Sequence, residues 1–181
     1  MKRNIKTTDL KIISELMKIS RRSDRQLAKA VGVSQPTVTR MRLRLEKEGY
    51  IREYTVIPDF MKLGYHLLGI NFLKLRKELS PKDVDKARQT ARQSVADSKF
   101  GIVMAERGLG LGYDGVVISL YKSYSDYSRH MDAIKQYPFV ELSSSDSFLI
   151  SMDDSIHYLP FTLKKYASLL LNTEDEESKM K

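Results

Sequence analysis

The chain has 181 residues, 41% of them hydrophobic, and a formal net charge of +8. This apolar share excludes a disordered chain, and the absence of cysteine excludes disulfides, thiolate metal sites and a cysteine nucleophile. Charged residues interrupt the apolar positions near the N-terminus, so we expect no leader, no membrane span and a cytoplasmic location.

The excess positive charge is concentrated in the N-terminal third of the chain. Residues 1–60 contain 14 Lys/Arg against 7 Asp/Glu, whereas residues 61–181 contain 17 against 16. A basic segment joined to a nearly neutral one is typical of a module that binds a polyanion and is attached to a second domain.

The first two predicted elements are helices. Apolar residues recur at helical spacing over residues 8–19. Ser23 and Gln26, three residues apart, form the capping-box pattern that opens a second helix. Gly32 ends this helix, because glycine adopts the left-handed conformation that a tight turn requires.

A third helix and a short strand follow. Ser34 is the expected N-cap, Pro36 lies in the first turn, where its missing N–H does no harm, and Gly49 closes the helix. Residues 50–59 then alternate in polarity and end near Pro58, which predicts a short strand or wing.

The spacing of small and apolar residues across the second and third helices is that of a helix-turn-helix. The motif needs a small residue where the helices touch, a glycine in the turn and apolar anchors on the inner faces. These positions are Leu27, Ala28, Val31, Gly32, Val33, Val38 and Met41. Several matching offsets favour DNA binding over the alternative of a solvated, charged surface helix.

The outer face of the third helix would then face DNA. Gln can pair with adenine, Arg with guanine, and Thr can hydrogen-bond to a base or contact a thymine methyl. Arg44 and Lys47 are expected opposite the inner stripe and near phosphates, whereas Leu43 fits neither face. The candidate DNA contacts are Ser23, Arg25, Ser34, Gln35, Pro36, Thr37, Thr39, Arg40, Arg44 and Lys47.

The rest of the chain predicts a ferredoxin-like β-α-β-β-α-β domain, which makes the fold class α+β. The expected elements are a strand over 67–76, a helix from Ser80 to about Asp97, strands over 100–107 and 115–121, a helix from Ser123 to about Tyr137, and a strand over 140–150. An appended helix over 158–172 and a frayed acidic tail should follow. The predicted domains are a winged helix-turn-helix over 1–58, a linker over 59–66, the ferredoxin-like domain over 67–152, and the C-terminal helix and tail over 153–181.

A glycine-rich stretch, GLGLGYDG over residues 108–115, joins the second and third strands. It joins strand to strand rather than strand to helix, so it lacks the helix N-terminus that would hold a phosphate. A hairpin turn, with Asp114–Gly115 and the other glycines supplying positive φ, is favoured. A loop that contacts an effector is the second interpretation.

The chain resembles the Lrp/AsnC family of feast/famine transcriptional regulators. The resemblance rests on QLAKAVGVSQPTVTR, RLEKEGYIREYTVIPDFMKLG and GYDGVVISLY, in this order. It implies a homodimer formed through the sheets of RAM-type domains, sometimes assembled into tetramers or octamers. It also implies an amino-acid or other small effector between subunits, near Gly110, Gly112, Tyr113 and Asp114. Residues 161–172 extend past the family pattern, and we expect them to cap the dimer or alter its assembly.

The resemblance and the basic helix together predict a sequence-specific regulator that binds a pseudo-palindromic operator in double-stranded DNA. A haem-pathway decarboxylase that has lost DNA binding is the alternative. His66, His130 and His157 are isolated, and Asp153–Asp154 beside His157 is a weak metal candidate. We therefore expect no catalytic residue, metal or cofactor. RNA binding is disfavoured because the second and third strands lack paired aromatic residues.

Overall fold

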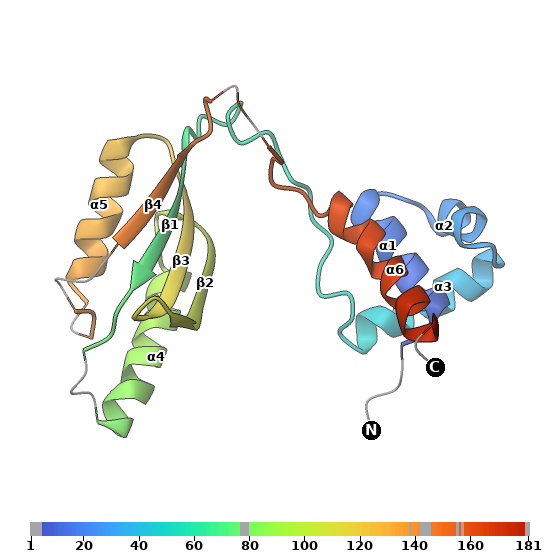
Figure 1. The fold of residues 1–181 in the computed structure, drawn as a ribbon, viewed down its shortest axis with the longest axis horizontal. Coiled ribbons are helices and arrows are strands. Elements are labelled where there is room, and N and C mark those ends of the chain that lie inside the picture. The colour runs from blue at the N-terminus through green and yellow to red at the C-terminus, as the bar shows by residue number, and fades with distance from the viewer. Residues whose placement is uncertain are drawn as a thin grey trace. The chain divides into compact units, whose positions relative to one another are not determined.

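The computed structural model describes residues 5–76, 80–137, 139–141, 146–154, 156 and 158–179. They belong to two compact units (Figure 1), of which one comprises Met1–Pro58 with His157–Lys181 and the other Asp59–Ile156. The first unit is helical and the second is built on a sheet, so the α+β prediction is confirmed.

Three helices form the core of the first unit. They are α1 (Thr7–Lys18), α2 (Asp24–Val31) and α3 (Gln35–Lys47), close to the predicted bounds. Their buried apolar side chains meet in one cluster, whose members are Ile12, Leu16, Leu27, Ala28, Val38 and Leu45. Burial of this cluster removes the inner stripe of α3 from water, as the helix-turn-helix spacing predicts.

The turn between α2 and α3 forms as predicted, except at Ser34. The Ser23 N–H donates to Gln26 Oε1 at 2.8 Å and the Gln26 N–H donates to Ser23 Oγ at 3.3 Å, which completes the capping box. Gly32 has a φ of 80°. Ser34 occupies the N-cap position of α3, but its hydroxyl pairs with Thr37 Oγ1 at 2.9 Å and caps no backbone N–H.

The predicted wing strand does not form. Residues 52–59 have no regular secondary structure and belong to no strand of the described sheet. Side chains hold this segment instead: the Tyr54 phenol donates to Glu46 Oε1 at 2.6 Å, and Ser20 Oγ donates to the Thr55 carbonyl at 3.2 Å. Burial and the Glu46 carboxylate raise the pKa of Tyr54 to about 12, which keeps its phenol a donor.

Two acidic residues attach α3 to the helices beneath it. The Asp9 carboxylate of α1 is only 2% exposed and forms an ion pair with Arg44. Asp24 of α2 accepts a hydrogen bond from Thr39 Oγ1 at 2.6 Å and forms an ion pair with Arg42 Nε at 3.0 Å. Two arginines of α3 are therefore engaged within the protein.

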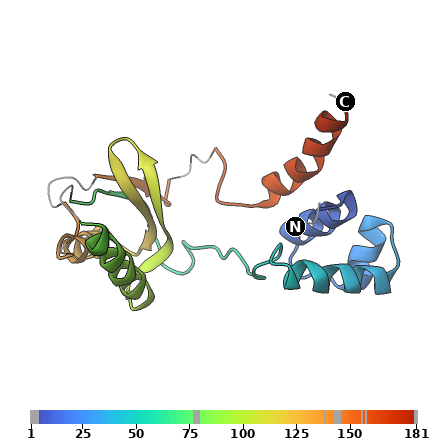
Figure 2. The same ribbon diagram turned by 90° about the horizontal axis from the view of Figure 1, so that it is seen from below.

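The C-terminal helix α6 (Lys164–Lys179) is a fourth helix of this unit. It lies next to α1 (Figures 1 and 2), where the buried Ser14 hydroxyl donates to the Ala167 carbonyl at 2.7 Å. The frayed-tail prediction is wrong for residues 173–179, because α6 continues through them to Lys179, and the glutamates among them are good helix formers. Residues 164–172 of the extension thus contact α1 of the same chain, and the expectation that the extension caps the dimer or alters its assembly stays a prediction.

The second unit is a four-stranded antiparallel sheet with two helices. Its elements are β1 (Leu67–Leu73), α4 (Pro81–Ala96), β2 (Gly101–Gly110), β3 (Tyr113–Tyr121), α5 (Tyr124–Lys135) and β4 (Asp146–Ser151). The strand order β2-β3-β1-β4 is that of a ferredoxin-like fold. Of the predicted last strand, Val140 pairs with Leu75 in an isolated bridge, and residues 142–145 lie outside the described part of the chain.

The face of the sheet on the α5 side contains a buried chain of polar side chains. On the α5 side, the Asn71 amide donates to the Tyr121 phenol at 3.0 Å, and that phenol lies 2.8 Å from His130 Nδ1. Because the phenol already accepts from Asn71, it can donate to an unprotonated Nδ1. Burial lowers the pKa of His130 to about 4. This histidine therefore belongs to a buried hydrogen-bond chain.

We expect Arg44→Ala to destabilise the helical unit. It leaves the buried Asp9 carboxylate without its cation, which should lower the free energy of unfolding by about 2 kcal/mol after allowance for the partly exposed arginine. Urea unfolding followed by helical circular dichroism measures the change. Lys47→Ala, an exposed change on the same helix, is the control and should alter stability by less than about 0.5 kcal/mol. Equal effects of the two changes would contradict the structural role of Arg44.

We expect His130 to make stability depend on pH in a defined window. Its folded pKa of about 4 lies below the ordinary histidine value of about 6.5, so the unfolded chain binds the proton more readily. The free energy of unfolding should be level above pH 6.5 and fall by up to about 3 kcal/mol as the pH drops toward 4. Urea titrations across this range should show the loss in the natural chain and in the exposed-histidine control His66→Gln. An undiminished pH slope in His130→Gln would refute this assignment.

Candidate nucleic-acid interface

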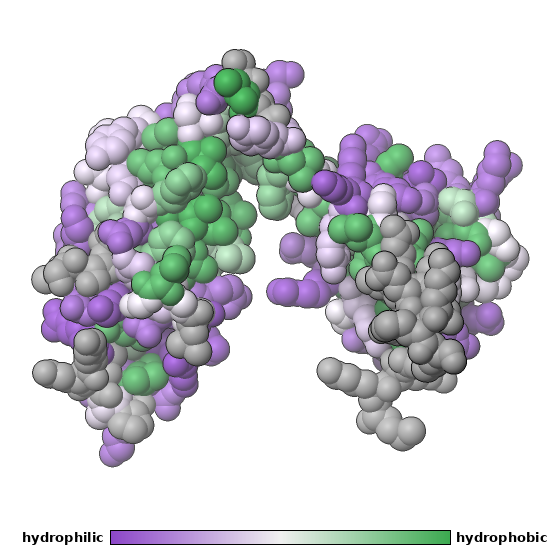
Figure 3. Space-filling model, in the orientation of Figure 1, coloured by the Kyte–Doolittle hydropathy of each residue, from purple (hydrophilic) through white to green (hydrophobic). Residues whose placement is uncertain are grey.

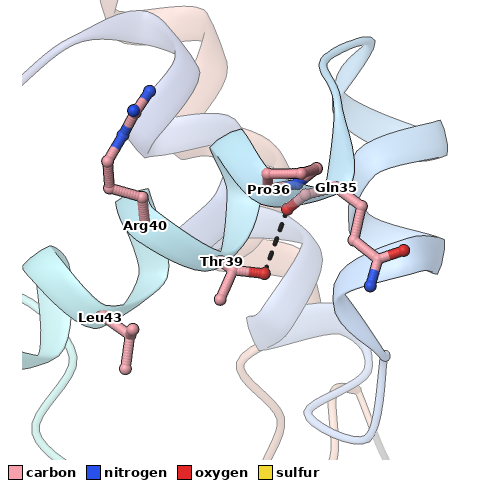
Figure 4. A pocket seen from close by; sticks show the side chains of 5 residues that line it. All are labelled: Gln35, Pro36, Thr39, Arg40 and Leu43. Carbon is pink, nitrogen blue, oxygen red and sulfur yellow. Dashed lines mark hydrogen bonds between the residues drawn. The ribbon is translucent and has the colours of Figure 1, made fainter.

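The outward face of α3 presents a continuous arc of side chains. Residues of a helix advance by about 100° each, which places the arc opposite the buried Val38 and Leu45. A shallow depression on this face is shown in Figure 4. It is lined by Gln35, Pro36, Thr39, Arg40 and Leu43.

Two polar side chains of the arc are free to meet a ligand in the way the sequence predicts. Gln35 and Arg40 are both exposed, and Figure 4 shows their side chains extending away from the helix in different directions. Arg40 takes part in none of the ion pairs of the described residues. An amide and a guanidinium on one exposed helix face can each form paired hydrogen bonds with a base edge.

Thr39 lies on the same arc but offers only part of its side chain. Its hydroxyl is directed inward, donating to Asp24 Oδ2 at 2.6 Å and approaching the Gln35 carbonyl at 3.1 Å. The second of these bonds is drawn in Figure 4. Of the two roles predicted for this threonine, the geometry supports a contact through the methyl group.

The predicted position of Arg44 on the outer face is wrong. Its guanidinium turns toward α1 and pairs with Asp9, because a buried carboxylate requires a nearby cation. A second carboxylate oxygen, on Glu48, lies 4.0 Å from Arg44 Nε. Lys47 is exposed and, one turn beyond Leu43, lies along the same arc as Arg40.

The remaining predicted DNA contacts lie at the first turns of α2 and α3. Arg25 is exposed in the first turn of α2. The hydroxyl of Ser23 caps α2, and the hydroxyls of Ser34 and Thr37 bond to each other. Arg25 thus keeps a charge available at this end of the motif, whereas the three hydroxyls already have partners within it.

Leu43 is the residue of this face that sequence reasoning did not assign. It is 56% exposed and follows both Gln35 and Arg40 along the helix. Around the helix axis, its direction falls between the directions of these two residues. The available signal was its spacing: it follows Thr39 by four residues, so the two share a face.

The predicted effector residues lie at the β2–β3 hairpin of the second unit. Leu111 and Gly112 form its two-residue turn with φ of 53° and 81°, so the turn lies three residues before the predicted Asp114–Gly115. Tyr113 donates to the Asp146 carboxylate, and Asp114 Oδ2 accepts from the Leu75 N–H at 2.9 Å. Both side chains therefore have partners within the sheet.

The other sequence candidates acquire structural partners or lie outside the described residues. Asp153 Oδ1 lies 2.7 Å from His66 Nδ1, and His157 is not among the residues described. Within the described ranges, no three His, Asp or Glu side chains come together as metal ligands. None of the described helices is both long and apolar enough to cross a membrane.

Comparison with known proteins agrees with this geometry. A family model of winged helix-turn-helix DNA-binding domains matches residues 5–52. A helix-turn-helix-type transcriptional regulator of Pyrococcus furiosus is 30% identical over 137 residues, which are 76% of this chain and 86% of the relative. The regulator LrpC of Bacillus subtilis is 46% identical over 56 residues, covering 31% of this chain and 39% of LrpC.

Solved structures extend the match across both units. The structure of LrpC aligns with a TM-score of 0.68 at 22% identity, covering 87% of this chain and 100% of LrpC. A transcriptional regulator of Neisseria meningitidis in complex with L-Met aligns with a TM-score of 0.70 at 18% identity, covering 90% and 99%. These likenesses concern the fold, and the regulators named here disfavour the decarboxylase alternative. The chain belongs to the Lrp/AsnC family of DNA-binding transcriptional regulators.

Proposed function

We propose that two copies of this chain bind a pseudo-palindromic operator in the cytoplasm, each placing α3 in the major groove. The exposed arc of α3 carries this proposal. Arg42 and Arg44 are held by acidic residues within the unit, whereas Gln35, Arg40 and Lys47 face outward. The side chains that can contact bases, Gln35 and Arg40, are thus distinct from the arginines that position the helix, Arg42 and Arg44.

The roles along the arc follow from the chemistry of the groups. Gln35 and Arg40 lie toward the N-terminal half of α3, the part of a recognition helix that approaches base edges. Lys47 lies at its C-terminal end and Arg25 on α2, where each can neutralise a phosphate. Two such helices about 34 Å apart would meet successive major grooves on one side of the duplex.

The open face of the sheet supports the dimer. Side chains alternate along each strand, so the residues facing away from Asn71 and Tyr121 share one surface. Figure 3 shows hydrophobic side chains gathered over this unit. Those of the open face include Leu68, Ile70, Met104, Ile118, Phe148 and Ile150, and Phe148 is 63% exposed. A second copy would bury this surface, and further dimers could join into a tetramer or octamer.

An amino acid or other small effector is the remaining part of the proposal. The relative from Neisseria meningitidis is described in complex with L-Met and shares this fold. In this chain the Tyr113 and Asp114 side chains are engaged with Asp146 and Leu75. Effector contacts at this hairpin would therefore fall to the backbone around Gly110 and Gly112, both exposed.

We expect Arg40→Ala and Lys47→Ala to weaken DNA binding in different ways. Selection from a random duplex library yields the bound sequence, and titrations at several salt concentrations follow. Arg40→Ala should weaken binding to the selected duplex about 10- to 100-fold and relax the preference at one base position. Lys47→Ala should weaken selected and scrambled duplexes alike and reduce the salt slope by about one.

Two results would contradict these roles. An unchanged selectivity in Arg40→Ala would mean that this arc does not read bases. Failure of the library to yield any preferred sequence would refute sequence-specific binding altogether. Arg40 is exposed and makes no described ion pair, so a folding defect is not expected, and helical circular dichroism verifies this.

We expect Phe148→Asp to separate the copies. A charge introduced on the open sheet face would be costly to bury against a second copy, so light scattering should report a monomer. Tyr158→Asp, an acidic replacement of another exposed aromatic residue outside the sheet, is the control and should keep the natural assembly. An unchanged mass in Phe148→Asp would rule out this face as the dimer contact.

A further inference from the structure

Leu43 is an apolar side chain exposed at the centre of the arc of α3. It is 56% exposed and does not belong to the cluster that packs the three helices. On a helix advancing about 100° per residue, Thr39 and Leu43 differ by about 40°, so the two side chains follow one line along the helix. Packing in the hydrophobic core therefore does not explain the presence of this leucine.

Apolar groups of Pro36 and Thr39 extend the surface around Leu43. The Thr39 hydroxyl is bound to Asp24 and approaches the Gln35 carbonyl, so the methyl group is the part of this side chain left for an external contact. Figure 4 shows the methyl carbon on the side away from the drawn hydrogen bond, with Leu43 beyond it. Together with the Pro36 ring, these groups form an apolar strip that lines the depression.

The surroundings of this strip identify the class of its occupant. The exposed Gln35 amide and Arg40 guanidinium flank it, which suits a surface that carries hydrogen-bond acceptors and negative charge around a small apolar group. The major groove of DNA presents such a group in one place, the C5 methyl of thymine. An apolar protein surface would leave the guanidinium and the amide without partners.

We propose that Leu43, together with the Thr39 methyl, recognises a thymine methyl group in the operator. This inference rests on the proposed function, because it requires α3 to enter the major groove. It assigns to the apolar strip a specificity that the hydrogen-bonding side chains do not supply. Gln35 and Arg40 would read acceptors and donors, whereas Leu43 would distinguish thymine from other bases by its methyl group.

The test removes the methyl group from the DNA and the side chain from the protein, separately and together. Each thymine of the duplex obtained by library selection is replaced in turn by deoxyuridine, which lacks the methyl and keeps the base pair. For at least one thymine in each half-site, this replacement should make the natural chain bind the duplex about three- to tenfold more weakly. Leu43→Ala should bind the thymine duplex more weakly by a similar factor and be insensitive to deoxyuridine at that position.

Lys47→Ala is the matched control on the same helix. It should bind all duplexes more weakly and keep the full sensitivity to deoxyuridine, because its change lies at a phosphate rather than at the methyl. Leu43→Met preserves apolar volume and should retain most of the sensitivity. Since Leu43 is more than half exposed, its alanine variant should keep the natural unfolding midpoint, which urea titration verifies.

The outcomes separate failure of this inference from failure of the proposed function. If no duplex is preferred by the natural chain, sequence-specific binding fails and the inference fails with it. If a duplex is preferred but no deoxyuridine substitution weakens it, or if Leu43→Ala keeps the sensitivity, DNA binding stands and the methyl contact is refuted. The methyl contact is also refuted if Leu43→Ala binds every duplex more weakly and thymine and deoxyuridine duplexes are weakened equally.

Discussion

The pairing of two acidic residues with arginines of α3 is the interaction on which the outward face of this helix depends. Apolar contacts through Val38 and Leu45 bury one side of the helix but tolerate small rotations, because hydrophobic burial is not directional. Asp9 and Asp24 remove this freedom. A buried carboxylate without a cation is costly, so the helix is held at the rotation that brings Arg44 and Arg42 to these acids. The arc from Gln35 through Leu43 is thereby turned outward.

The same constraint divides the basic residues of α3 by function. A helix with arginines at alternate positions could direct them all into solvent, where they would act as a diffuse positive surface. Here Arg42 and Arg44 are engaged internally and Arg40 is left outside. The face proposed to meet DNA consequently combines one guanidinium and one amide with an apolar strip. Such a mixture suits base recognition better than attraction to phosphates alone.

The helices and strands were largely predictable because their signals are local. The Ser23–Gln26 capping box and the glycine at position 32 each act within a few residues. The errors concern partners distant in sequence. Residues 50–59 have a strand-like pattern, yet no described strand pairs with them. The last helix was predicted, but its contact with α1 through Ser14 and Ala167 joins positions 153 residues apart.

The sequence by itself determined the helix-turn-helix, the order of the ferredoxin-like elements and most of the polar residues on the face of α3. Periodicity and capping are sufficient for these features, because they reflect the geometry of single elements. Only the tertiary structure decided which arginine turns inward, that the Thr39 hydroxyl is already bonded, and that Leu43 is exposed at the centre of the arc. These outcomes depend on carboxylates of α1 and α2, whose positions opposite α3 arise only when the helices pack.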